Sequence, residues 1–276
     1  MSQISVPNIY GILGYPLGQS MSPLIHNTSF KDNGINAAYY SFPTPPEKIA
    51  TFMEAIRLLN IRGCSVTIPH KQTILPYLDK VTDRVKKIGA ANLIYWEGDK
   101  LCGDNTDIIG FMAPLQANKP NPAYKKILIL GAGGAARAAV VGLQDLGYTD
   151  ITVTDIVEDL PAKLAKDFNL KTISWDKRDT VDAQIIVNAS PLGMKGKYED
   201  ESPYKAEWFK GKKGIAYDIV YTPYVTLFRK YAEEAGWESI SGREMFIGQA
   251  DAQFKAWTGK NLSKDAVQAV IDALSK

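Results

Sequence analysis

Residues Lys125–Arg137 read KKILILGAGGAAR, and their pattern indicates the fold class. Lys125–Leu130 is typical of a buried strand, and the residues that follow predict a helix that continues to Leu146 and stops at Gly147. Gly131, Gly133 and Ala136 match the G-x-G-x-x-G/A pattern of a dinucleotide-binding turn between strand and helix. The first glycine permits the tight turn, the second lets the backbone approach a pyrophosphate, and the small third residue permits close packing.

An acidic residue follows the next predicted strand, Ile151–Thr154. Asp155 lies 24 residues after Gly131, where a carboxylate binds the ribose hydroxyls of NAD and repels the 2′-phosphate of NADP. Residues 156–159 supply no arginine for that phosphate and add two further acids. The sequence therefore predicts NAD as the favoured cofactor, with NADP as the alternative. A glycine-rich turn without a ligand and a methyltransferase are the other interpretations of this motif.

The composition excludes several classes of protein. The chain has 276 residues, 45% of them apolar and 22% charged, which is typical of a globular protein of about two domains. The formal net charge is +2 and no basic stripe is present, so we expect no nucleic-acid partner. No apolar run has the length of a membrane span, and residues 1–12 lack the pattern of a signal peptide. We therefore expect a cytoplasmic protein that does not bind a membrane.

A metal site is not expected either. The two cysteines, Cys64 and Cys102, are 38 residues apart, a separation that matches no zinc motif, and His26 and His70 are the only histidines. We expect neither histidine to be a catalyst. The predictions therefore include no metal.

The first third of the chain alternates short apolar strands with amphipathic helices, which predicts an α/β fold with mostly parallel pairing. Ser22, followed by Pro23, is expected to cap a helix that runs to about Asn33. Residues 114–124 contain three prolines and no periodicity, and they are the best candidate for a linker.

Small polar side chains gather in five short motifs outside the glycine turn. Single residues in them could be helix caps, turn residues or surface residues, but five such motifs beside a dinucleotide fold indicate a substrate site. The motifs are Ser20-Met21-Ser22, residues 65–71 (SVTIPHK), Asn92, residues 104–107 (DNTD) and residues 248–253 (GQADAQ).

With these motifs the chain resembles the shikimate dehydrogenase family over essentially its whole length. Seven motifs occur in the family's order: GQSMSPLIHN at Gly18–Asn27, VTIPHK at Val66–Lys71, GDNTD at Gly103–Asp107, GAGGAARA at Gly131–Ala138, NASPLGM at Asn188–Met194, YDIVYTP at Tyr217–Pro223 and GQADAQF at Gly248–Phe254. The resemblance implies reversible reduction of 3-dehydroshikimate to shikimate with a nicotinamide cofactor. It also implies an N-terminal α/β substrate-binding domain, residues 1–116 completed by helices of about 243–276, and a Rossmann-type dinucleotide-binding domain, residues 117–242.

The resemblance also assigns candidate site residues. Lys71 and Asp107 match the catalytic pair that handles the proton. The matching substrate-binding residues are Ser20, Ser22, Thr67, Asn92, Tyr221 and Gln249. The matching cofactor-binding residues are Gly131, Ala132, Gly133, Gly134, Ala135, Ser190, Ile219, Gly242 and Met245. Asp155 is a further cofactor-binding candidate because of its position after the second strand. The hydroxyl and amide side chains supply directed hydrogen bonds for a polyhydroxylated carboxylate without a charge penalty.

The chain departs from the family pattern at several positions. Ser65 stands where the family usually has Asn, Leu93 where it has Thr, Ile108 where it has Gly, and Asp155-Ile156-Val157 where it has Asn-Arg-Thr. The first three changes leave quinate or an aminoshikimate open as substrates, although Ser22 favours shikimate. A catalytically silent sensor of NAD or a metabolite is a further alternative, against which the retention of Lys71 and Asp107 argues. The sequence leaves a monomer and a homodimer equally open.

Overall fold

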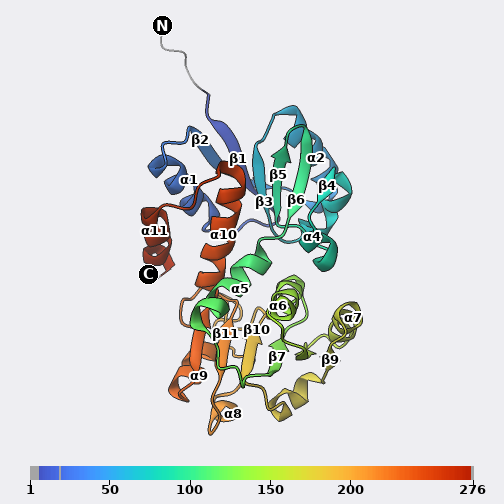
Figure 1. Cartoon of the computed structure of the whole chain (residues 1–276), viewed down its shortest axis with the longest axis vertical. Helices are drawn as coiled ribbons and strands as arrows, with labels where there is room; N and C mark the ends of the chain where they lie inside the picture. Colours follow the sequence, from blue (N-terminus) through green and yellow to red (C-terminus); the bar gives the residue numbers. More distant parts are fainter. Residues whose placement is uncertain (1–5, 19, 275–276) are drawn as a thin grey trace. The chain divides into compact units, whose positions relative to one another are not determined.

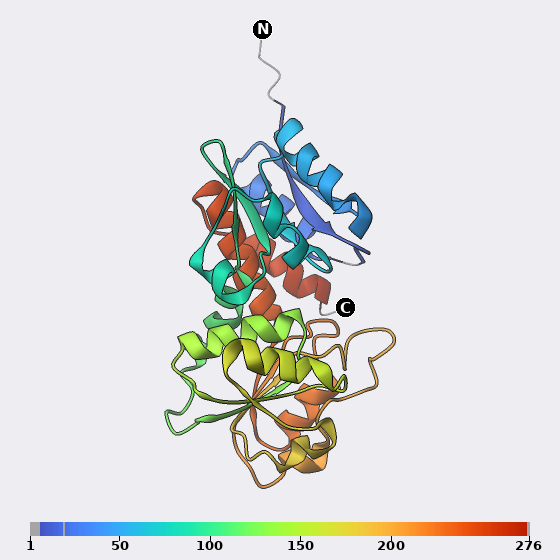
Figure 2. The same ribbon diagram turned by 90° about the vertical axis from the view of Figure 1, so that its right-hand side faces the viewer.

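The computed structural model describes residues 6–18 and 20–274, so Gln19 of the first family motif lies outside the described residues. The chain forms two compact units, each built on a six-stranded sheet (Figures 1 and 2). Of the described residues, unit 1 contains 6–106 and 249–273, and unit 2 contains 107–248 and Leu274. These limits differ by up to ten residues from the domain limits expected from the sequence, which stay a prediction.

The sheet of unit 1 has the order β2-β1-β3-β5-β6-β4. Its strands are β1 (Asn8–Gly14), β2 (Ala37–Pro43), β3 (Gly63–Val66), β4 (Lys80–Val81), β5 (Leu93–Glu97) and β6 (Lys100–Asp104). Its helices are α1 (Ser22–Asp32), α2 (Ile49–Leu58), α3 (His70–Thr73), α4 (Asp83–Ile88), α11 (Lys264–Leu274) and the second half of α10 (Gly242–Thr258). One apolar core includes Leu13, Ile56 and Ile94 and contacts α2, and another includes Tyr10, Phe30 and Phe254.

The pairing in unit 1 is less parallel than the sequence predicted. β1 pairs in parallel with β2 and β3, but β5 is antiparallel to both β3 and β6. A tight turn at Gly98, which has a φ of +60°, joins β5 to β6 without a crossover helix. Because the sequence analysis did not predict β6 as a strand, it missed this hairpin.

The outer strand β2 is fastened to α1 by one side chain. The amide of Asn27 donates to the backbone oxygen of Tyr39 at 2.9 Å and accepts the backbone N–H of the same residue at 2.8 Å. Asn27 thus takes the place of a further strand at this point of the sheet edge.

The sheet of unit 2 is wholly parallel, with the order β12-β11-β10-β7-β8-β9. Its strands are β7 (Lys126–Leu130), β8 (Asp150–Thr154), β9 (Lys171–Thr172), β10 (Ile185–Asn188), β11 (Ile215–Asp218) and β12 (Glu238–Ser241). Its helices are α5 (Asp107–Asn118), α6 (Gly134–Asp145), α7 (Asp159–Phe168), α8 (Ala206–Phe209), α9 (Leu227–Glu234) and the first half of α10. Helices α6 and α7 cover the same face of the sheet (Figure 2), as right-handed crossovers require.

The predicted linker is partly wrong. Residues 114–118 belong to α5, which continues through Pro114 to Asn118. Proline removes one helical hydrogen bond, but Phe111 and Leu115 bury the apolar face of α5, and this burial outweighs the loss. Only residues 119–125 connect α5 to β7 as an irregular segment.

Candidate active site

In unit 1 the candidate residues gather at one edge of the sheet. Ser20 follows the carboxyl end of β1, Thr67 follows that of β3, and Thr106 follows that of β6. Asn92 immediately precedes β5, whose direction is antiparallel to β3 and β6, so it reaches the same edge. The topology alone therefore collects polar side chains that are far apart in the sequence.

Ser20 and Ser22 lie together, although not as expected. Met21 is the N-cap of α1 and makes no side-chain cap bond, so the prediction that Ser22 caps this helix is wrong. The hydroxyl of Ser20 instead accepts the backbone N–H of Ser22 at 3.2 Å, which leaves Ser22 as the first residue of the helix. Both serines therefore belong to the turn that begins α1.

Asn92 is the centre of a buried polar cluster. Its Nδ2 donates to Thr106 Oγ1 at 3.1 Å and to Gln249 Oε1 at 3.4 Å, and its Oδ1 accepts the Thr106 N–H at 2.7 Å. The backbone oxygen of Lys71 accepts the N–H of Ala91 at 2.7 Å. The cluster thus joins two predicted substrate residues, Asn92 and Gln249. It also fixes Thr106, which precedes Asp107. The backbone of Lys71 is bonded to Ala91, the residue before Asn92.

The GDNTD motif is held by an ion pair. Arg84 and Thr82 donate to the carboxylate of Asp104, and Asn105 donates to the Ala90 oxygen at 3.0 Å. Burial alone would raise the pKa of Asp104, but the hydrogen bonds from Arg84 and Thr82 outweigh burial and lower the pKa. The Asp104 carboxylate is therefore ionised at neutral pH, and it holds the motif in place by accepting hydrogen bonds from Arg84 and Thr82.

In unit 2 the glycine turn lies where the strand order reverses, between β7 and β10. Ligands of parallel sheets bind outside the carboxyl ends of the strands at this point. Gly131 has a φ of +110°, and a Cβ on it would lie 2.7 Å from the backbone nitrogen of Ser190. Gly131 and Ser190, both predicted cofactor residues, are thus brought together, and α6 begins directly after Gly133.

Asp155 fastens the glycine turn from the end of β8. Its Oδ2 accepts the N–H of Ala132 at 2.7 Å, and its Oδ1 accepts the N–H of Val157 at 2.9 Å. The apolar side chains that follow, Ile156 and Val157, are 73% and 53% exposed. The segment after β8 therefore presents a carboxylate and an apolar surface beside the turn.

Asn188 and Asp218, which are buried at the ends of β10 and β11, were missed by the sequence analysis. Asn188 Oδ1 accepts from the N–H and the hydroxyl of Ser190, at 3.1 and 2.7 Å, and its Nδ2 donates to Asp218 Oδ1 at 2.9 Å. Asp218 also accepts from the Val220 N–H and the Thr226 hydroxyl. Burial raises the pKa of Asp218 to about 7, although these donors oppose the shift. Their place at strand ends in NASPLGM and YDIVYTP could have indicated them.

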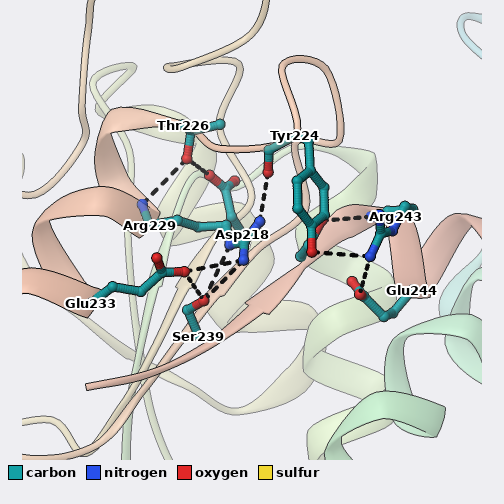
Figure 3. A network of polar contacts seen from close by, with 9 residues as sticks. Asp218, Tyr224, Thr226, Arg229, Glu233, Ser239, Arg243 and Glu244 are labelled. Atoms are coloured by element: carbon teal, nitrogen blue, oxygen red, sulfur yellow. Dashed lines mark hydrogen bonds and ion pairs between the residues drawn. The ribbon is translucent and has the colours of Figure 1, made fainter. Parts of the chain in front are cut away.

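The loop after β11 is held from several sides (Figure 3). The Arg229 and Arg243 guanidinium groups lie 4.8 and 4.0 Å from the ring centroid of Tyr224, and Thr226 reaches Asp218 from the same loop. Arg229, which lies in α9, also donates to Glu233 of the same helix and to Ser239 of β12, so its side chain connects α9 to β12. The loop that carries Ile219 and Tyr221 is therefore rigidly shaped.

The remaining cofactor candidates border this loop. A Cβ on Gly242 would lie 2.1 Å from the backbone oxygen of Ile219, so only glycine permits this approach. Tyr221 stacks on Phe246 with ring centroids 5.4 Å apart, and Met245 is buried beside it in the sequence. Burial raises the pKa of Tyr221, which therefore stays a neutral phenol.

A parallel-sheet unit with a dinucleotide turn, together with a unit that gathers hydroxyl and amide groups, defines a nicotinamide-dependent oxidoreductase of the Rossmann type. The family model described as "Shikimate dehydrogenase substrate binding domain" matches residues 12–94. A protein named shikimate dehydrogenase (NADP(+)) from Pelobacter propionicus is 58% identical over 275 residues, covering 100% of this chain and 99% of the relative. The chain belongs to the shikimate dehydrogenase family.

Solved structures agree with this assignment. Shikimate 5-dehydrogenase from Thermus thermophilus in complex with NADP(H) and shikimate has a TM-score of 0.86 at 30% identity, with 97% of this chain and 99% of that chain covered. Quinate dehydrogenase from Corynebacterium glutamicum in complex with NAD has a TM-score of 0.90 at 25% identity, with 98% and 100% covered. The comparisons support a nicotinamide cofactor, but the closely related sequences are named for NADP(+) and give the predicted preference for NAD no support.

Two further observations bear on the function. Within residues 6–18 and 20–274, none of the helices combines the length and apolar character needed to cross a bilayer. The same residues contain no group of three or more histidine, cysteine or acidic side chains arranged to hold a metal.

Proposed function

We propose that this protein catalyses the reversible reduction of 3-dehydroshikimate to shikimate with a nicotinamide dinucleotide. The observation that carries this proposal is the polar cluster formed by the buried Asn92 and Thr106 with the half-buried Gln249. Thr106 directly precedes Asp107, and the backbone of Ala91, next to Asn92, is bonded to that of Lys71. Such amide and hydroxyl groups bind ring hydroxyls and reject analogues that lack them, because buried polar groups would be left unpaired. The polar groups come from unit 1, and the dinucleotide turn comes from unit 2.

The chain's own residues bind the substrate and move one proton. Ser20, Ser22 and Tyr221 hold the carboxylate, whereas Thr67, Asn92 and Gln249 hold the ring hydroxyls. The bound nicotinamide supplies or accepts the hydride. In the direction of reduction the Lys71 ammonium protonates the developing alkoxide, and in oxidation the neutral Lys71 amine accepts the hydroxyl proton. Asp107 is the second member of this proposed catalytic pair.

The cofactor residues proposed here are Gly131–Ala135 for the pyrophosphate and Ser190, Ile219, Gly242 and Met245 for the nicotinamide and adenine pocket. The glycine turn has room for a pyrophosphate, because a Cβ on Gly133 or Gly134 would meet no protein atom within 4 Å. Backbone N–H groups at the start of α6 also favour an anion there.

We also propose that NAD is the preferred cofactor, although the sequence relatives are named for NADP(+). The support is Asp155, whose carboxylate is fixed by two backbone donors, and the acids at 158 and 159 in place of a basic group. Like charges disfavour a 2′-phosphate at this position. Steady-state Michaelis constants for both cofactors test the preference, and a tighter and faster reaction with NADP would overturn it.

Quinate is the second candidate substrate, because Ser65 is smaller than the family's usual Asn. A screen of shikimate and quinate with NAD and NADP, with Lys71→Ala as the inactive control, tests the proposed function. We expect the fastest turnover with shikimate, and quinate as the better substrate would favour the alternative. Binding of dinucleotide without turnover of either substrate would instead indicate a sensor.

A further inference from the structure

A buried chain of hydrogen bonds crosses unit 1 beside the proposed substrate residues. The Tyr39 phenol donates to Ser65 Oγ at 2.7 Å, and the Ser65 hydroxyl donates to Gln253 Oε1 at 2.6 Å. All three side chains are buried, with 3%, 5% and 1% of their residue surface exposed. The three residues come from β2, β3 and α10. The hydrogen bonds therefore connect two strands to a helix that is distant in the sequence, since Ser65 and Gln253 are 188 residues apart.

The direction of these bonds is fixed at one end. Gln253 Nε2 donates to the backbone oxygen of Asn92 at 3.1 Å, so its Oε1 must face Ser65. A carbonyl oxygen can only accept, and the single hydroxyl proton of Ser65 is therefore directed to Gln253. Ser65 accepts from Tyr39 in turn. Its proton is consequently not offered to a substrate.

Gln253 also belongs to a stripe of α10 that is bonded to the start of β5. Gln249, Gln253 and Trp257 follow one another at intervals of four residues, which places them on one face of the helix. Gln249 contacts the Asn92 side chain, Gln253 contacts the Asn92 backbone, and Trp257 Nε1 donates to the Ile94 oxygen at 3.0 Å. The orientation of α10 about its own axis is thereby coupled to Asn92.

We propose that Tyr39, Ser65 and Gln253 are positioning residues, which hold α10 so that Gln249 and Asn92 meet the ring hydroxyls of the substrate together. This inference rests on the proposed function and deepens it, since it assigns Ser65 a task other than substrate contact. When the Ser65 hydroxyl is removed, Gln253 Oε1 loses the donor that lies 2.6 Å away, and its amide shifts to restore the lost hydrogen bond. That shift moves the turn of α10 that carries Gln249.

Ser65→Ala and Tyr39→Phe test the proposal, with the KM for shikimate measured separately from the KM for the dinucleotide. We expect Ser65→Ala to lower kcat/KM for shikimate about tenfold and Tyr39→Phe about three- to tenfold, because Ser65→Ala removes two buried hydrogen bonds and Tyr39→Phe removes one. The KM for the dinucleotide should stay within about twofold of the wild-type value. The double variant should be no worse than Ser65→Ala, because both changes break the same series of bonds. Ser65→Thr, which keeps the hydroxyl, should restore most of the activity.

Two control variants separate positioning from a general loss of packing. Tyr40→Phe changes the next tyrosine of β2, which is half exposed, and Ser29→Ala removes a buried hydroxyl of α1 that accepts the Ser263 N–H at 3.1 Å. Both should leave the two KM values unchanged. The rise in melting temperature caused by shikimate alone gives a readout without turnover, and it should be smaller in Ser65→Ala than in the wild type.

The possible results separate the positioning role of Ser65 from the proposed function. A Ser65→Ala protein that melts at a lower temperature but keeps its shikimate KM and kcat would show a purely structural role and overturn the inference. Equal rises in both KM values would overturn it as well. If the wild-type protein turns over neither shikimate nor quinate, the proposed function fails instead, so the two failures are distinguishable.

Discussion

Asn188 donates a hydrogen bond to Asp218 across the ends of two neighbouring strands of unit 2, at 2.9 Å. Asn188 also orders Ser190, and Asp218 also orders Val220 and Thr226. One amide and one carboxyl group thus fasten the two loops that carry the proposed cofactor residues Ser190 and Ile219.

The stability of the protein should depend on pH through Asp218. Burial raises the pKa of this carboxyl group from 3.8 to about 7, so the folded protein binds the proton more tightly than the unfolded chain. Its contribution to the free energy of unfolding is fully present below about pH 4 and is lost as the pH rises through about 7. The difference between the free energy of unfolding of the wild type and that of Asp218→Asn should therefore decrease as the pH rises from about 4 to about 7. Urea unfolding at several pH values measures this difference, with the exposed Asp99→Asn as a control for the loss of charge, and a pH-independent difference would contradict the prediction.

Lys71→Ala should lower kcat by about 10²- to 10⁴-fold, the range expected for loss of a general acid, and raise the KM for shikimate far less. Asp107→Asn should also lower kcat. Steady-state kinetics with chemistry rate-limiting provides the test, and a kcat of Lys71→Ala close to the wild-type value would count against the assigned role.

Two glycines of the dinucleotide turn should respond differently to the same substitution. Gly131→Ala should lower the free energy of unfolding by about 1–3 kcal/mol, because its Cβ would meet the backbone of Ala189 and Ser190 at 2.7 Å. Gly133→Ala should leave stability nearly unchanged, because a Cβ there meets no protein atom within 4 Å, yet it should raise the KM for the dinucleotide. Thermal unfolding and cofactor kinetics of both variants separate the effects. An unchanged KM for the dinucleotide in Gly133→Ala would show that the pyrophosphate does not bind at this turn.

The preference between cofactors should be reversible at the end of β8. Asp155→Ser combined with Ile156→Arg removes the repelling carboxylate and adds a bidentate donor for a 2′-phosphate. The ratio of kcat/KM for NADP to that for NAD should rise by about 10- to 100-fold, as expected for one or two charge-assisted bonds. Val157→Ala is a suitable control, since it changes an exposed neighbour without a change of charge. An unchanged ratio would mean that the 2′-position of the ribose lies elsewhere.

Features that depend on local sequence were predictable. The strand, glycine turn and helix at 126–145 appear as expected. The resemblance assigns Asn92, Gln249, Gly131 and Ser190 to the site, and the structure brings Asn92 to Gln249 and Gly131 to Ser190.

Features that depend on distant partners were not predictable. Nothing near Ser22 reveals that the Ser20 hydroxyl, and not its own, serves the start of α1. Pro114 suggests a break, and only the burial of α5 against the rest of unit 2 explains why the helix continues. Ser65 and Gln253 are separated by 188 residues, so their hydrogen bond depends on the tertiary fold.

The strand β2 has seven residues without a single charge, and it forms the outer border of its sheet. Borders of this kind invite strands of other molecules to add to them and begin aggregation. Asn27 occupies both backbone groups of Tyr39 and so blocks such an addition at the middle of the strand. This asparagine, from a motif otherwise associated with substrate binding, therefore removes one backbone donor and one backbone acceptor from the outer border of the sheet.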